Sequence, residues 1–205
     1  MKKVLALAFC FLLSTLAATA APNRANKGEI GLNGIGVSYN DSDISAAAGF
    51  GGSFSYGINR NLAIGVSGDW SRSNLDAHTA TGTKIEGAKV KSIPVLFDII
   101  LRPFADDGPF GLYGTLGLGL LVDDIDGRGT LTDNNLKADR NNDFALNLGG
   151  GAEWFVTENW AYYLEASYLF TGAAVDISNS ANNNKIESHG LDAWYFGVGI
   201  KYLFT

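Results

Sequence analysis

Bulky apolar residues alternate with small or polar residues along most of this chain. The alternation is clearest near the end of the sequence, in residues 191–205. There every second residue is large and apolar: Trp194, Phe196, Val198, Ile200, Tyr202 and Phe204. The residues between them include Ala193, Gly197, Gly199 and Lys201. Because successive side chains of a strand point to opposite faces, the segment predicts a strand with one apolar face and one small, polar face.

Seven earlier segments repeat this alternation. They predict strands at about 29–39, 47–58, 62–73, 88–102, 110–122, 144–154 and 160–171. Short turns at 59–61, 103–108 and 157–159 alternate with longer polar loops, three of which span about 74–87, 123–142 and 172–190. Pro94 lies inside the fourth predicted strand, where it removes a ladder hydrogen bond, so we expect a local distortion there.

The arrangement of the two faces indicates a membrane-spanning barrel. An apolar outer band, a polar interior, an even number of strands and short turns on one side only are typical of outer-membrane β-barrels. Aromatic residues are expected near both ends of the strands: Trp154, Trp160, Tyr202 and Phe204 near the turns, and Trp70, Tyr168, Phe170 and Trp194 near the loops. The alternative is a soluble eight-stranded barrel of the lipocalin type, which would turn the apolar face inward.

The first residues predict export. Lys2 and Lys3 precede an apolar run from Val4 to Leu13, and Ala18-Thr19-Ala20 offers a cleavage site, so residues 1–20 are predicted to be a signal peptide. Residues 21–205 are then the barrel domain, located in the outer membrane. The mature segment carries 13 basic and 21 acidic residues, a charge of −8, which argues against nucleic-acid binding. Cys10, the only cysteine, lies in the predicted signal peptide.

Several segments resemble a known family. These are Ser92-Ile93-Pro94-Val95-Leu96, Gly111-Leu112-Tyr113-Gly114, and the segment 149–154 of sequence GGGAEW. Together with the alternation they make the mature chain similar to the small eight-stranded outer-membrane barrels of the OmpA, OmpX and OmpW type, of the porin-like families. Val198, Ile200, Tyr202 and Phe204 also resemble the C-terminal signal read by the barrel assembly machinery, although Thr205 follows the usual terminal Phe. The resemblance implies an all-β, antiparallel, up-and-down transmembrane barrel, but no particular activity.

A set of charged residues has the inward parity: Glu29, Asp69, Asp98, Glu153, Glu165 and Lys201. An eight-stranded barrel is just wide enough for its own side chains to fill it, so we expect these groups to satisfy one another and occlude the lumen. The predicted role is structural or surface interaction through loops exposed outside the cell. The alternative is a narrow channel or transporter for small, hydrophobic molecules.

The sequence does not favour an enzyme. Some small outer-membrane barrels are lipid A-modifying hydrolases, but here His78 and His189 fall in or beside loops, and no His-x-Ser occurs. Asp123, Asp124 and Asp126 lack the later ligands of a calcium loop, so no metal site or cofactor is predicted.

Basic residues on the outward parity mark one rim. Arg72, Lys89 and Lys91 should reach the outer interface, where they either bind phosphates of lipopolysaccharide or simply extend into the headgroup layer. The expected partners are therefore outer-membrane lipids and lipopolysaccharide, the assembly machinery, and small hydrophobic solutes or host and surface ligands. The chain is expected to be a monomer.

Overall fold

The computed structural model describes residues 22–78, 84–103, 108–126, 136–140, 143–172, 174–179 and 185–205. Within these ranges only the backbone is described at 75–78, 84–88, 125–126, 136–140, 174–179 and 185–189. The predicted signal peptide and Cys10 lie outside the described residues, and so do the side chains of His78 and His189. No helix in the described part is long and apolar enough to cross a membrane.

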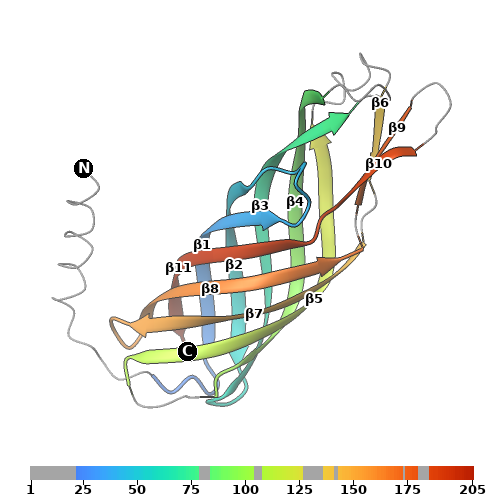
Figure 1. Cartoon of the computed structure of the whole chain (residues 1–205). Helices are drawn as coiled ribbons and strands as arrows, with labels where there is room; N and C mark the ends of the chain where they lie inside the picture. Colours follow the sequence, from blue (N-terminus) through green and yellow to red (C-terminus); the bar gives the residue numbers. More distant parts are fainter. Residues whose placement is uncertain are drawn as a thin grey trace, which may run out of the picture.

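Eight antiparallel strands close into one barrel, in the order β1-β11-β8-β7-β5-β4-β3-β2 (Figure 1). The strands are β1 (Gly28–Tyr39), β2 (Ala47–Gly57), β3 (Leu62–His78), β4 (Lys84–Leu101), β5 (Phe110–Asp126), β7 (Asp143–Phe155), β8 (Trp160–Thr171) and β11 (Ala193–Phe204). β1 pairs with β11 from Gly28↔Phe204 to Tyr39↔Ala193. This pairing joins the first and last strands and leaves no free sheet edge in the barrel. The predicted eight-stranded barrel is confirmed.

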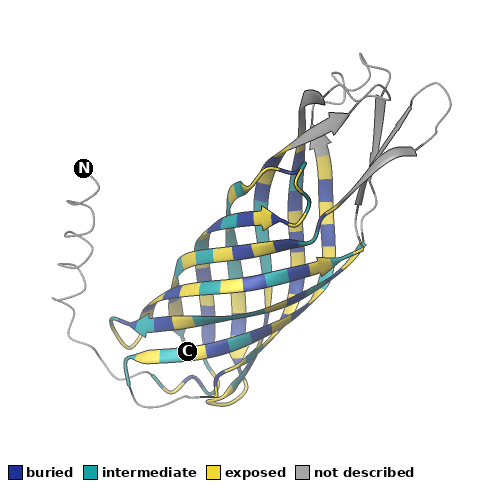
Figure 2. Ribbon diagram, in the orientation of Figure 1, coloured by how far each residue is buried: buried dark blue, intermediate teal, exposed yellow. Residues whose placement is uncertain are grey.

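The apolar residues of the barrel strands face outward, as the alternation predicts. Side chains such as Phe50, Leu112 and Leu164 are more than half exposed, and exposed residues alternate with more buried ones along the coloured parts of the barrel strands (Figure 2). The soluble, lipocalin-type alternative is therefore wrong, because it would put these side chains inside. Aromatic pairs lie near both ends of the strands, with ring centroids 4.8 Å apart for Trp160–Tyr202 and 5.1 Å apart for Tyr168–Trp194.

Three segments that were predicted to be irregular loops contain strands, so these predictions are wrong. β3 continues to His78 and β4 begins at Lys84, so most of 74–87 is strand. β6 (Leu136–Arg140) lies in the predicted loop 123–142, and β9 (Ala174–Asn179) and β10 (Lys185–Gly190) lie in 172–190. The three pair as a small sheet, β10-β9-β6, at the loop end of the barrel (Figure 1). Strands that continue beyond the apolar band carry polar residues, so their apolar alternation disappears although their backbone pairing continues.

The predicted distortion at Pro94 is present and local. β3 and β4 pair at Gly68↔Val95 and again at Ser71↔Ser92, but the two intervening pairs are missing. Both would need a hydrogen bond from the amide of residue 94 to the carbonyl of Asp69, and proline has no amide hydrogen. On its other side Pro94 still pairs with Leu121 of β5. The wall therefore lacks one hydrogen bond and keeps its register.

Candidate functional site

The interior of the barrel is the candidate site, and it has three layers. At the turn end lies a charged floor, which consists of Arg24, Glu29, Arg102, Glu153 and Lys201. Above it lies a polar cavity. At the loop end lies an apolar plug, a cluster of buried residues that includes Ile35, Val37, Leu96, Leu121, Leu169, Leu191 and Tyr195. The six charged residues predicted to point inward all lie in the first two layers.

The floor is a connected set of ion pairs. Arg102 contacts both carboxylate oxygens of Glu29 through Nη2, at 2.9 and 2.8 Å. Arg24 pairs with Glu29 at 3.5 Å and with Glu153 at 2.5 Å, and Lys201 approaches Glu153 at 3.7 Å. All five side chains are more than nine-tenths buried. Buried ions need such partners, so each member of the floor depends on the others.

Arg24 was not among the residues predicted to point into the barrel. The segment before β1 folds under the barrel: the Asn26 amide donates to the carbonyl of Gly57 at 2.7 Å, and the Gly57 amide donates to that of Lys27 at 2.9 Å. A side chain at position 57 would collide with the Arg24 carbonyl, so this close approach requires glycine. The Arg24 guanidinium then lies 4.5 Å from the ring centroid of buried Phe155, in cation–π range.

Two tyrosines connect the floor to the cavity above it. The Lys201 ammonium lies 4.0 Å from the ring centroid of Tyr113 and 4.5 Å from that of Tyr163. The Tyr113 hydroxyl donates to Glu165 at 2.8 Å. Both tyrosines are buried, and their rings cover the lysine.

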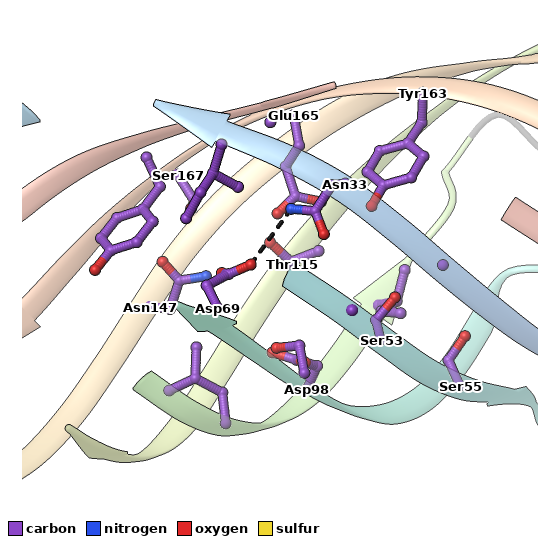
Figure 3. A pocket seen from close by; sticks show the side chains of 18 of the residues that line it. Asn33, Ser53, Ser55, Asp69, Asp98, Thr115, Asn147, Tyr163, Glu165 and Ser167 are labelled. Carbon is purple, nitrogen blue, oxygen red and sulfur yellow. Dashed lines mark hydrogen bonds between the residues drawn. The ribbon is translucent and has the colours of Figure 1, made fainter. Parts of the chain in front are cut away.

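The cavity is small and lined mainly by oxygen-bearing side chains. Asp69, Asp98, Glu165, Asn33 and Thr115 face it from five different strands (Figure 3). Its volume, measured as the space that the centres of water molecules can reach, is about 70 Å³. Asn33 donates to Asp69 at 3.3 Å. With about 10–15 Å³ needed per water, the cavity holds roughly five water molecules.

The apolar plug is the second feature that the sequence analysis missed, since it predicted a polar interior throughout. Val37, Leu121, Leu169 and Leu191 are at most 2% exposed. Tyr39 is buried beside them and donates to Ser92 at 3.2 Å. Their inward parity could have been read from the sequence, but the apolar residues on the opposite face made the inner ones look like interruptions of the pattern.

The predicted basic rim lies outside the barrel at its loop end. Arg72 and Lys89 are exposed, and Arg72 is directly opposite Lys91 across the β3–β4 ladder. On the other side Lys91 is paired in register with Asp124, and Lys89 with Asp126. Asp124 of β5 is exposed beside the rim and reduces its net charge.

The residues of the resembling C-terminal signal, Val198, Ile200, Tyr202 and Phe204, form the outward face of β11. The Phe204 ring packs over Gly28, where a Cβ would come within 2.5 Å of it. Asp123 is buried, while Asp124 is exposed. Among the described residues no group of three or more His, Cys, Asp or Glu side chains is placed to hold a metal ion directly.

Comparison with solved structures finds the same barrel. OprG from Pseudomonas aeruginosa superposes with a TM-score of 0.76 at 17% identity, covering 89% of this chain and 98% of that one. Outer membrane protein W of E. coli gives 0.56 at 16% identity, with 88% and 99% covered. Ail, the attachment invasion locus protein of Yersinia pestis, gives 0.53 at 15% identity, with 88% and 99% covered. At these identities the likeness establishes the fold.

No match to the sequence was found among curated proteins. In contrast, the sequence model of the family described as outer membrane protein beta-barrel domain matches residues 4–204, nearly the whole chain. An eight-stranded closed barrel with an exposed apolar band agrees with that match. The chain therefore belongs to the outer membrane protein β-barrel family, and its place is the outer membrane.

Proposed function

We propose that this protein is a sealed outer-membrane barrel that forms no open pore and acts through contacts on its outer surface. The observation that carries the proposal is the closure of the lumen at both ends. The charged floor closes the turn end, which in this family type faces the periplasm, and the apolar plug closes the loop end. A water-filled pore needs a continuous polar path, and the buried leucines of the plug interrupt it.

Conductance in planar bilayers tests the seal. We expect refolded residues 21–205 to show no steady conductance. A variant that weakens both seals, Arg24→Ala with Leu121→Ser, should show small, flickering currents because water can then enter from both ends. Arg60→Gln, in the exposed turn before β3, serves as the control and should stay silent. A large, steady conductance of the unaltered chain would contradict the proposal.

The outer surface offers one contact of definable chemistry. Arg72 and Lys91 lie opposite one another at the loop end, and Lys89 lies on the same outward face. At this height the rim meets the phosphates of the outer leaflet, which suit the planar fork of Arg and the point charge of Lys. We assign lipopolysaccharide phosphate to this rim, with Asp124 limiting how many phosphates it holds.

Stabilisation by lipopolysaccharide tests the rim. Added lipopolysaccharide should raise the unfolding midpoint of the refolded barrel, and the triple variant Arg72→Gln, Lys89→Gln, Lys91→Gln should lose most of that rise. Arg60→Gln again serves as the control, because it removes a charge at the opposite end of the barrel. If the triple variant keeps the full rise, the cations merely extend into the headgroup layer.

Passage of small hydrophobic molecules through the wall is the second candidate. One observation favours it: Pro94, at the missing hydrogen bond between β3 and β4, also lines the cavity, together with Ile35 and Leu96. A solute that crosses there would reach the membrane without passing the floor. Uptake of a lipophilic fluorescent dye into proteoliposomes, measured for the unaltered chain and for Pro94→Ala, separates this function from the sealed barrel.

A further inference from the structure

Three carboxylates share the cavity, and one basic residue of the floor, Lys201, also lines it. Asp69 of β3, Asp98 of β4 and Glu165 of β8 all line it (Figure 3). Asp69 accepts a hydrogen bond from Asn33 and Glu165 accepts one from Tyr113. In the described part of the chain, the ion pairs of Arg24, Arg102 and Lys201 go to Glu29 and Glu153, and none goes to any of the three.

The interior therefore carries excess negative charge. The floor contributes Arg24, Arg102 and Lys201 against Glu29 and Glu153, a surplus of one positive charge. The cavity contributes three carboxylates. Across both layers the described residues sum to two negative charges. Because an uncompensated charge away from bulk water is costly, these carboxylates must either take up protons or hold a counterion.

Thr115 points independently to an occupant. Its side chain is only 9% exposed, it lines the cavity, and its hydroxyl oxygen has no hydrogen-bond partner in the structure. Buried hydroxyls of this kind are nearly always bonded, to protein or to ordered water. An ion that brings its own water molecules would supply the missing partner.

Two glycines keep the cavity open. A Cβ at Gly117 would lie 2.6 Å from the Asp98 carboxylate, and one at Gly51 would collide with that of Asp69. Each carboxylate thus rests against a wall position without a side chain. A larger residue at either position would displace the neighbouring carboxylate.

Size and geometry select the class of ion. Among the described residues no three carboxylates converge closely enough to ligate one metal ion together. The cavity holds roughly five waters. Mg²⁺ loses its waters reluctantly and is commonly bound through one or two carboxylates while it keeps several of them. A doubly charged ion also matches the surplus of two negative charges.

We propose that the mid-barrel cavity binds one partly hydrated divalent cation of the Mg²⁺ class. One or two of Asp69, Asp98 and Glu165 ligate it directly, the others hold it through its remaining waters, and Thr115 is hydrogen-bonded to one of those waters. The ion neutralises the interior and is enclosed between the floor and the apolar plug. It enters when the barrel closes during folding. This site is independent of the rim and of the proposed surface contacts.

Refolding with and without the ion tests the site. Residues 21–205 are refolded in zwitterionic detergent, free of lipopolysaccharide, with MgCl₂ or with N-methylglucamine chloride at equal ionic strength. A ligand that binds only the folded state stabilises it, so Mg²⁺ should raise the thermal midpoint by several degrees. Mn²⁺ should replace it, and electron paramagnetic resonance after removal of free ion should show about one bound Mn²⁺ per barrel.

The matched variants are Asp98→Asn with Glu165→Gln, and the control Glu158→Gln in an exposed turn. The double variant should lose the Mg²⁺ effect and the bound Mn²⁺, and without the ion it should be more stable than the unaltered chain, because repulsion is relieved. The control should behave like the unaltered chain.

If the double variant does not refold, Asp98→Asn alone takes its place. Equal midpoints with and without Mg²⁺, an effect of KCl as large as that of MgCl₂, or retention of Mn²⁺ by the double variant would overturn the proposal.

Discussion

The two ends of the barrel interior are packed through different interactions, ion pairs at one end and apolar contacts at the other. At the turn end, Arg24, Glu153 and Lys201 form a seal in which each charge compensates another. At the loop end, Leu121, Leu169 and their neighbours form a seal by close packing of apolar side chains. A charged seal depends strongly on each of its partners, because removal of one leaves another buried and unpaired. An apolar seal should weaken in proportion to the volume removed.

The largest expected effect is at the shared carboxylate of the floor. Glu153→Gln keeps the shape but leaves Arg24 and Lys201 with less compensation, so we expect a loss of about 3–5 kcal/mol of stability. Urea unfolding in detergent, followed by tryptophan fluorescence, measures it. Glu158→Gln, in an exposed turn, should change little. A Glu153→Gln barrel as stable as the control would show that the floor ions are solvated after all.

A smaller loss is expected in the apolar plug. Leu169→Ala removes a side chain that is 1% exposed, and large-to-small changes of this kind cost about 2–4 kcal/mol. Leu164→Ala, five positions earlier on β8 but facing lipid, is the matched control, because lipid or detergent can fill the space it leaves. Similar losses for the two variants would mean that the plug is not tightly packed.

Lys201→Met tests whether Lys201 or Arg24 is the main partner of Glu153 in the floor. Glu153 keeps its contact with Arg24, and a methionine can occupy the space between the rings of Tyr113 and Tyr163. We therefore expect a loss of only about 1–2 kcal/mol with normal membrane insertion. Heat-modifiable gel migration checks insertion and urea unfolding checks stability. A loss as large as that of Glu153→Gln would make Lys201, rather than Arg24, the main partner of the carboxylate.

The sequence predicted the barrel well because lipid imposes one simple rule on every strand. Outward positions such as Phe54, Leu118 and Val198 must be apolar, so strand after strand repeats the same signal. Beyond the apolar band the rule ends, and the extensions of β3, β4 and β5 and the sheet β10-β9-β6 were read as loops. Their pairing depends on backbone hydrogen bonds that leave no such mark on the sequence.

The candidate site was predictable only in part. Parity placed Glu29, Asp98 and Glu153 inside, because a charged residue among apolar neighbours stands out. Arg24 could not be found in this way, since it precedes the first strand and reaches the floor through a turn held by Gly57. Which charges pair, and which are left in the cavity, depends on the stagger of strands distant in the sequence.

The smallest expected effect is at Pro94, beside both the cavity and the wall. Pro94→Ala restores the amide that can donate to the Asp69 carbonyl, which adds about 0.5–1.5 kcal/mol. The more flexible unfolded chain takes back about 0.4–1 kcal/mol, so the net change in stability should be close to zero. Hydrogen exchange should nevertheless show slower exchange of the amides of Asp69 and Ser71, which donate into the β3–β4 ladder on either side of the missing bond. Floor and plug should be unaffected, since neither includes this bond.

If exchange is unchanged, the gap between β3 and β4 is set by something other than the missing amide. If exchange slows and dye uptake falls with it, the wall at Pro94 is a route into the membrane.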